Sequence, residues 1–166
     1  HLHGARMQPE PLDVQSITLK ASALYEMLRA EWPALKGSMP WDAPGDTPWT
    51  FWILGYFFDK GKALEFKVET KALPGRGGTG QYLVDLCWWT EQRGEYWLEL
   101  ALESEWQPGK GEIEHDFYKL IDVKSRLKVW VCSCGEKLMQ TRQSELPKEV
   151  SKARFKLSGE EYLIVN

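Results

Sequence analysis

Two neighbouring apolar segments of this chain contain acidic side chains where β-strands ordinarily avoid them. The segments are Tyr82–Trp89 (YLVDLCWW) and Tyr96–Trp106 (YWLELALESEW), and both have the composition of strands. Asp is depleted in strands, and a carboxylate among apolar neighbours is costly unless a positive group compensates it. We therefore expect a divalent cation, a lysine or both beside these carboxylates.

Side-chain alternation predicts which of these carboxylates converge. Odd-numbered positions of the second segment share one face, which places Glu99, Glu103 and Glu105 together. If this face coincides with the face that carries Asp85, then Asp85, Glu103 and Glu105 meet at one end of a hairpin. Glu99 is expected to face solvent. For Glu103 and Glu105, simple solvent exposure opposite a basic residue is the alternative explanation.

Three carboxylates at the end of a hairpin suit a hard cation such as Mg²⁺ (or Mn²⁺). Mg²⁺ prefers oxygen ligands and usually takes one or two carboxylates together with water and substrate phosphates. A cation held by Asp85, Glu103 and Glu105 would lower the pKa of a bound water and stabilise the charge that develops during phosphodiester hydrolysis. Lys119, in the next helical segment, could reach both the carboxylates and a phosphate; an ordinary helix-surface lysine is the alternative.

The hydrophobic pattern predicts the elements that would position these side chains. Three helices are expected: Ser16–Trp32, Pro48–Asp59 and Glu112–Lys124. Pro33 is expected to end the first helix, and Gly61 the second. The expected strands are Leu64–Ala72, Tyr82–Trp89, Tyr96–Trp106, Leu127–Cys134, Ala153–Leu157 and Glu161–Val165. A turn around Arg93-Gly94 makes an antiparallel hairpin, and the helix before Leu127–Cys134 makes that strand a parallel neighbour. The result is an α/β fold around a small mixed sheet.

Length and composition favour one globular domain. The chain has 166 residues, of which 43% are hydrophobic and 27% charged. Residues 1–6 precede Met7 and are interpreted as an addition left from expression, so the domain is expected over 7–166, with its core at about 47–134. No apolar run suits a membrane span or a signal peptide. Three cysteines without the usual zinc spacing favour a reducing, cytoplasmic setting.

Charge is unevenly distributed along the chain. The net charge of −3 argues weakly against indiscriminate nucleic-acid binding. Residues 82–118 contain nine acidic against two basic side chains, whereas residues 136–156 contain six basic against three acidic ones. An acidic centre with a basic C-terminal region is compatible with a metal site beside a phosphate-contacting surface. Simple solvation of these charges is the alternative.

The order of elements from about 47 to 134 resembles the PD-(D/E)XK nuclease superfamily, also called restriction-endonuclease-like, whose core is αβββαβ. This family carries an Asp on its second core strand and (D/E)-x-K on its third. Here YLVDLCWW supplies Asp85, and LALESEW supplies Glu103-Ser104-Glu105. Glu105 stands where the family usually has lysine, and Lys119 in DFYKL is the position for a relocated lysine. The N-terminal helix and the C-terminal strands lie outside the resemblance.

The resemblance implies a Mg²⁺-dependent endonuclease that hydrolyses phosphodiester bonds of nucleic acid. Asp85 and Glu103 would hold Mg²⁺ or Mn²⁺, and Glu105 would be a further ligand, directly or through water. Lys119 would position or activate the attacking water, or stabilise developing negative charge. Asp59 on the first core helix is a candidate to complete the site. A chain of this size would need to act as a homodimer to cut both strands in one event, although nothing in the sequence requires it.

Two other classes of function remain open. The first is a catalytically inactive member of the same fold that acts as a binding or interaction module, which the net charge and Glu105 favour. The second is an unrelated α/β domain whose tryptophan-rich surface binds a small ligand or another protein. The chain has nine tryptophans. Most are expected to pack in the core or at its rim, and stacking of single-stranded nucleic acid on exposed ones is the alternative.

Overall fold

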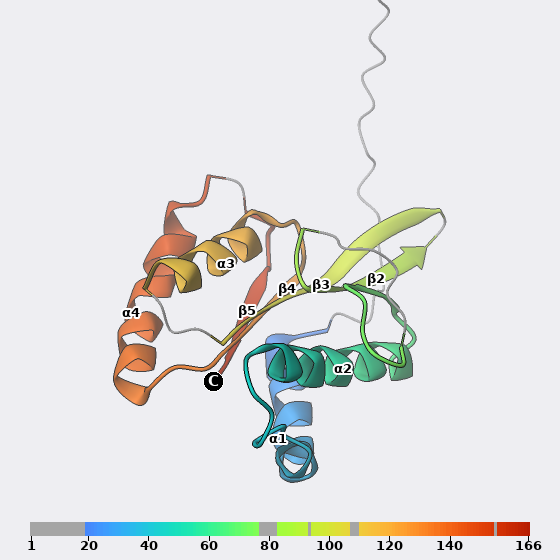
Figure 1. Ribbon diagram of the computed structural model, residues 1–166. Helices are drawn as coiled ribbons and strands as arrows, with labels where there is room; N and C mark the ends of the chain where they lie inside the picture. The colour runs from blue at the N-terminus through green and yellow to red at the C-terminus, as the bar shows by residue number, and fades with distance from the viewer. Residues whose placement is uncertain (1–18, 77–82, 93, 107–109, 155) are drawn as a thin grey trace, which may run out of the picture.

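The computed structural model describes residues 19–76, 83–92, 94–106, 110–154 and 156–166, with only the backbone for 92 and 110–114. Its five-stranded sheet has the order β1-β2-β3-β4-β5. The strands are β1 (Lys67–Thr70), β2 (Leu86–Gln92), β3 (Glu95–Glu105), β4 (Leu127–Cys132) and β5 (Glu161–Val165). The helices are α1 (Ala21–Gly37), α2 (Thr47–Ala63), α3 (Lys110–Asp122) and α4 (Glu136–Lys152). Helices α1 and α2 lie on one face of the sheet, and α3 and α4 lie on the other (Figure 1).

The sheet is mixed, as the sequence predicts. Strands β1, β2 and β3 pair antiparallel, and the β2–β3 hairpin turns at Gly94, whose φ of 79° lies in the left-handed region that favours glycine. Strand β4 pairs in parallel with both β3 and β5, and α3 connects β3 to β4. The predicted order of helix, three strands, helix and strand is therefore present from α2 to β4, within one α/β domain.

The face covered by α1 and α2 contains one hydrophobic core. It buries Leu24 and Leu28 of α1, Ile53, Leu54 and Phe57 of α2, and Val68, Leu86, Trp88, Leu100, Leu102, Val129 and Val131 of the sheet. Trp88 stacks on Phe66 at a centroid distance of 5.2 Å and donates its indole N–H to the Phe57 carbonyl at 3.1 Å. The aromatic residues of α2 thus anchor this helix to the sheet.

The face covered by α3 and α4 contains a second core. It buries Phe117, Leu120 and Ile121 of α3, Met139 and Leu146 of α4, and Cys87, Ala101, Trp130 and Cys132 of the sheet. Phe117 packs edge-on against Trp130 at a centroid distance of 5.6 Å. This packing fixes α3 over β3 and β4, which sets the position of the lysine that α3 carries. Among the described helices, none has the length and apolar character that crossing a bilayer requires.

Two helices extend past the residues expected to end them. Helix α1 continues through Pro33 to Gly37, because burial of Leu35 offsets the backbone hydrogen bond that proline cannot donate. Helix α2 continues through Gly61 to Ala63, and Gly61 is buried against Trp88 and Val68. The expected start of α1 at residues 16–18, and the whole of residues 1–6, lie outside the described part of the chain.

The C-terminal third differs most from the sequence predictions. Helix α4 is not predicted, because its segment is polar and contains Pro147, although Met139, Arg142 and Leu146 form a buried stripe at helical spacing. The described residues of Ala153–Leu157 do not form the expected strand. Strand β5 is confirmed at the predicted residues. Strand β2 begins at Leu86 and ends at Gln92, whereas the expected strand is Tyr82–Trp89.

A β-bulge in β3 changes the predicted directions of its side chains. Trp88 pairs with Leu100, but the next residue, Trp89, pairs with Leu98, so Glu99 is the extra residue. Leu98 therefore packs in the core under α3 and α4, whereas Leu100 packs in the opposite core. A strict alternation would have placed both leucines on one face.

The prediction that Glu99 faces solvent is wrong. Only 1% of this residue is exposed. Its carboxylate accepts a hydrogen bond from the Thr90 hydroxyl at 2.9 Å and lies 3.8 Å from the guanidinium of Arg126. The bulge turns the side chain inward. The two partners offset only part of the cost of burial, because Oε2 has no hydrogen-bond partner within the described residues.

Candidate functional site

Asp85 precedes β2 directly and links the ends of three strands. Its Oδ1 accepts a hydrogen bond at 2.9 Å from Nζ of Lys71, which follows β1. Its Oδ2 accepts two hydrogen bonds from Ser104 of β3, one from the backbone N–H at 3.0 Å and one from the hydroxyl at 2.8 Å. The Thr70 hydroxyl donates to the backbone carbonyl of Asp85 at 3.0 Å. These bonds hold the Asp85 carboxylate in one orientation at the end of the sheet.

Glu103 and Lys119 form an ion pair between β3 and α3. Nζ of Lys119 lies 3.1 Å from Oε1 of Glu103 and 2.6 Å from Oδ1 of Asp116, which is one turn earlier on α3. The Glu103 side chain is 3% exposed, whereas the Lys119 side chain is 34% exposed. The structure therefore brings Lys119 to Glu103 and leaves part of the lysine open to a ligand.

Burial and neighbouring charges set the protonation of this pair. Burial raises the pKa of Glu103 to about 8, the negative charge of Asp85 adds to the rise, and Lys119 opposes it. Burial lowers the pKa of Lys119, but its bonds to Asp116 and Glu103 outweigh burial, so the pKa lies above its ordinary value. The lysine stays charged, while Glu103 holds its proton more strongly than an ordinary carboxyl.

The buried thiol beside these carboxylates is not a nucleophile. Burial raises the pKa of Cys87 to about 12, and the charges of Glu69 and Glu103 add to the rise. Because the thiolate is the reactive form, Cys87 is inert at neutral pH. Its shift shows that Glu69 of β1 also lies within electrostatic reach of this part of the sheet.

Glu105 and Asp59, the two other acidic residues predicted for the metal site, lie in different surroundings. Glu105 ends β3, half-buried, and its Cα is paired with that of Cys132 on β4. Asp59, in α2, forms a bidentate ion pair with Arg76 at 2.9 and 2.6 Å, which lowers the Asp59 pKa. To join the site, Asp59 would have to leave Arg76. Its role, like that of Glu105, stays a prediction.

Asp85 and Glu103 are the two carboxylates that this region offers as candidate metal ligands. Within the described residues, no three His, Cys, Asp or Glu side chains form a group that could hold a metal ion. The expected trio of Asp85, Glu103 and Glu105 is thus not assembled as one ligand set. Mg²⁺ commonly uses only one or two carboxylates, with water and phosphate in the other positions. The negative charge of Asp85 raises the pKa of Glu103, so the two carboxylates interact electrostatically. Each already accepts a hydrogen bond from a lysine ammonium, which a bound cation would have to displace.

Sequence reasoning missed the three residues that hold the site in place. Lys71 and Ser104 bind Asp85, and Asp116 binds Lys119. The signal for Asp116 is its spacing of three residues from Lys119 on a helix, which places both on one face. Lys71 and Ser104 carry no comparable signal, because their contacts depend on how the strands are paired.

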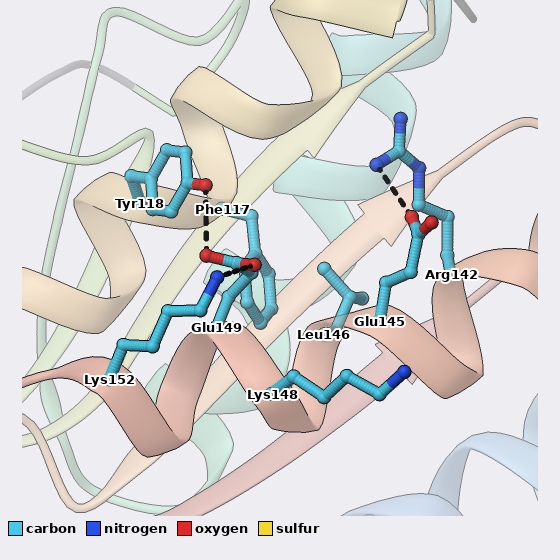
Figure 2. Close-up of a pocket in the computed structure, with 8 residues that line it drawn as sticks. All are labelled: Phe117, Tyr118, Arg142, Glu145, Leu146, Lys148, Glu149 and Lys152. Carbon is cyan, nitrogen blue, oxygen red and sulfur yellow. Dashed lines mark hydrogen bonds and ion pairs between the residues drawn. The ribbon is translucent and has the colours of Figure 1, made fainter.

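A cavity of about 560 Å³ opens elsewhere, between α3 and α4, and Figure 2 shows its lining. Arg142 lies 3.5 Å from a carboxylate oxygen of Glu145, and Lys152 lies 2.6 Å from one of Glu149. Two of the three basic side chains in the lining are thus already paired, which leaves little net positive charge for a phosphate. The region around Glu103 is the stronger candidate site.

Comparison with known proteins adds no relative. No family model, no curated protein and no solved structure matches this chain.

Proposed function

We propose that this protein is a metal-dependent phosphodiesterase acting on nucleic acid, with Asp85, Glu103 and Lys119 at its catalytic centre. The observation that supports the proposal most directly is the 3.1 Å contact between Nζ of Lys119 and Oε1 of Glu103. It joins the acidic position of the third core strand to a lysine on the following helix. The resemblance to restriction-endonuclease-like proteins assigns these same two positions to the catalytic centre.

Each residue has a role that its surroundings support. A divalent cation, when bound, would supply Lewis-acid polarisation of the phosphate and a water of lowered pKa. Asp85 and Glu103 would hold it, since they are the two acidic groups whose charges interact here. Lys119 is partly exposed and charged, so it can contact a phosphate oxygen and stabilise developing negative charge.

Neighbouring residues would keep these groups in position. Ser104 fixes the orientation of Asp85 through its backbone N–H and its hydroxyl. Asp116 holds the ammonium of Lys119 at 2.6 Å. Such preorganised charges cost little reorganisation during the reaction, which is the usual source of electrostatic catalysis.

The test is a Mg²⁺ and Mn²⁺ titration followed by nuclease assays on single-stranded and double-stranded substrates. Asp85→Asn and Lys119→Ala should each lower the rate by roughly a hundredfold or more. Lys124→Ala is the matched control, because Lys124 is an exposed lysine just after α3. Equal activity of Asp85→Asn and the unmodified protein would refute the proposal, since the hydrolysis would then come from another site or a contaminant.

A non-catalytic binding module is the second candidate. It is favoured by one observation, the absence of a group of three possible metal ligands among the residues that the structure describes. This alternative expects nucleic-acid binding without hydrolysis at any concentration of Mg²⁺ or Mn²⁺. It also expects Asp85→Asn to leave the binding affinity unchanged, because Asp85 would only hold Lys71 and Ser104 in place.

A further inference from the structure

Five tryptophans surround one cleft at the end of the sheet. Their side chains line a cavity of about 270 Å³, together with the residues that follow β4 and end β5. They are Trp32 of α1, Trp41 of the loop before α2, Trp49 and Trp52 of α2, and Trp106 directly after β3. The cleft therefore draws flat aromatic surface from several separate segments of the chain.

Trp49 lies at the centre of this cluster. Its ring centroid is 5.3 Å from that of Trp41, 6.1 Å from that of Trp52 and 5.7 Å from that of Trp106. The rings of Trp41 and Trp49 meet at 83°, in an edge-to-face contact. Trp41 stays 64% exposed, although aromatic side chains of this size are usually well buried.

Two rings of the cleft are oriented by hydrogen bonds. The indole N–H of Trp52 donates to the Ser38 hydroxyl at 3.1 Å, and that of Trp106 donates to the Thr50 hydroxyl at 2.9 Å. These bonds fix the two rings before any ligand arrives. A preorganised aromatic wall binds a flat ligand with a smaller loss of side-chain entropy than mobile side chains would.

We infer that this cleft binds a base of a single-stranded nucleic acid, which stacks on Trp41. Exposed indole rings are the usual platform for unpaired bases, since every base has a π-face. The cavity is slightly smaller than the roughly 300 Å³ at which pockets for drug-sized ligands begin, and it therefore suits one flat ring system. Oδ1 of Asn166 accepts a hydrogen bond from the backbone N–H of Cys134 at 2.9 Å. This bond orients the Asn166 side-chain amide at the wall of the cleft.

The position of the cleft favours a polynucleotide over other flat ligands. Trp106 lies two residues beyond Ser104, which binds Asp85. The cleft and the Glu103 site both lie at the end of the sheet where β3 and β4 finish. Trp106 packs with the core under α1 and α2, whereas Glu103 contacts Lys119 of α3 on the other face. A strand bound at both places would therefore cross this end of the sheet. The choice of nucleic acid as the ligand rests on the proposed phosphodiesterase function.

The test is the fluorescence anisotropy of a labelled short oligothymidylate, measured with EDTA so that no hydrolysis occurs. A duplex and an abasic oligonucleotide of the same length serve as comparison ligands, and both should bind more weakly. Trp41→Ala should weaken oligothymidylate binding by roughly fivefold to a hundredfold, and Trp41→Phe should retain most of the affinity. Tyr96→Ala is the matched control, since Tyr96 is an exposed aromatic residue at the other end of β3.

Two outcomes would overturn this inference. One is unchanged oligothymidylate binding by Trp41→Ala, as expected if the cleft instead receives an apolar peptide. The other is equal binding of the abasic strand, which would mean that the phosphates alone are recognised. Binding that depends on Trp41 without any Mg²⁺-dependent hydrolysis would support the cleft and refute the proposed phosphodiesterase. If hydrolysis depends on Asp85 but oligothymidylate binding does not depend on Trp41, the proposed phosphodiesterase is supported and the proposed base-binding cleft is refuted.

Discussion

Nζ of Lys119 lies 3.1 Å from Oε1 of Glu103, and only the lysine is substantially open to solvent. The pair therefore presents positive charge outward and an acidic group inward. Under the proposed function, a phosphate would contact the exposed ammonium, and Glu103 and Asp85 would be the ligands of a cation. This polarity distinguishes the pair from a surface ion pair, whose charges are both solvated and contribute little.

Glu103→Gln should make the free energy of unfolding less dependent on pH, because the unmodified protein loses stability as pH rises. Burial raises the pKa of Glu103 to about 8, whereas its ordinary value is 4.5. Between these values the unfolded chain binds fewer protons than the folded one, so the free energy of unfolding falls with rising pH. Glutamine does not titrate, so the difference in free energy of unfolding between protein and variant should change by at most about 1.4 kcal/mol per pH unit. Urea denaturation across this window measures it, and a constant difference would contradict the prediction.

Mg²⁺ should stabilise the protein more at about pH 8 than at about pH 5. Under the proposed function the cation would bind the carboxylate form of Glu103, so at the lower pH it would have to displace a proton. At a concentration a hundred times Kd, binding to the folded state alone adds about 3 kcal/mol. Thermal unfolding with and without Mg²⁺ measures this effect. Asp85→Asn should lose it, and Glu91→Gln should keep it, because Glu91 is an exposed acidic residue of β2. Loss in both variants would place the cation elsewhere.

The elements that follow local periodicity could be predicted from the sequence. The hairpin of β2 and β3, the crossover through α3 and the parallel strand β4 all follow from apolar patterns and turn residues. Helix α4 could not be predicted, because its stability comes from burying Met139 and Leu146 in a polar segment that contains Pro147. The bulge at Glu99 depends on pairing between strands, which a single strand's pattern does not reveal.

In the candidate site, too, the contacts that follow from the order of elements could be predicted, whereas those that depend on strand pairing could not. The approach of Lys119 to Glu103 could be predicted, because the order of strand, helix and strand places α3 over β3. The partners of Asp85 could not, because the contact with Lys71 depends on the register that pairs Thr70 with Leu86. A shift of one residue would turn the side chains of β1 to the other face.

Gly61→Ala should destabilise the protein, although alanine is ordinarily the better helix residue. A Cβ at this position would lie 2.7 Å from Cε2 of Trp88 and from Cγ2 of Val68, in the densely packed core. Overpacking of this kind typically costs about 1–3 kcal/mol. Gly37→Ala is the matched control, because Gly37 ends α1 with open space around it. Urea denaturation compares the two variants, and equal stability would show that Trp88 can move aside.

Lys128→Met should be strongly destabilising, because Lys128 is a charged residue within the sheet and only 1% of its side chain is exposed. Its ammonium lies 2.9 Å from Oε2 of Glu160, and it donates to the Tyr162 hydroxyl at 3.1 Å and to the Ile121 carbonyl at 3.2 Å. Removing one partner of a buried pair leaves the other charge uncompensated, which costs about 3–5 kcal/mol.

The double variant Lys128→Met with Glu160→Gln should recover part of the stability lost in Lys128→Met, because no unpaired charge then remains. The matched control is Lys152→Met. Lys152 also pairs with a glutamate, at 2.6 Å, but it is largely exposed, so its loss should leave the unfolding midpoint nearly unchanged. Urea denaturation of the three variants gives the comparison. If Lys128→Met were as harmless as Lys152→Met, the pair with Glu160 would not contribute to the stability of the sheet.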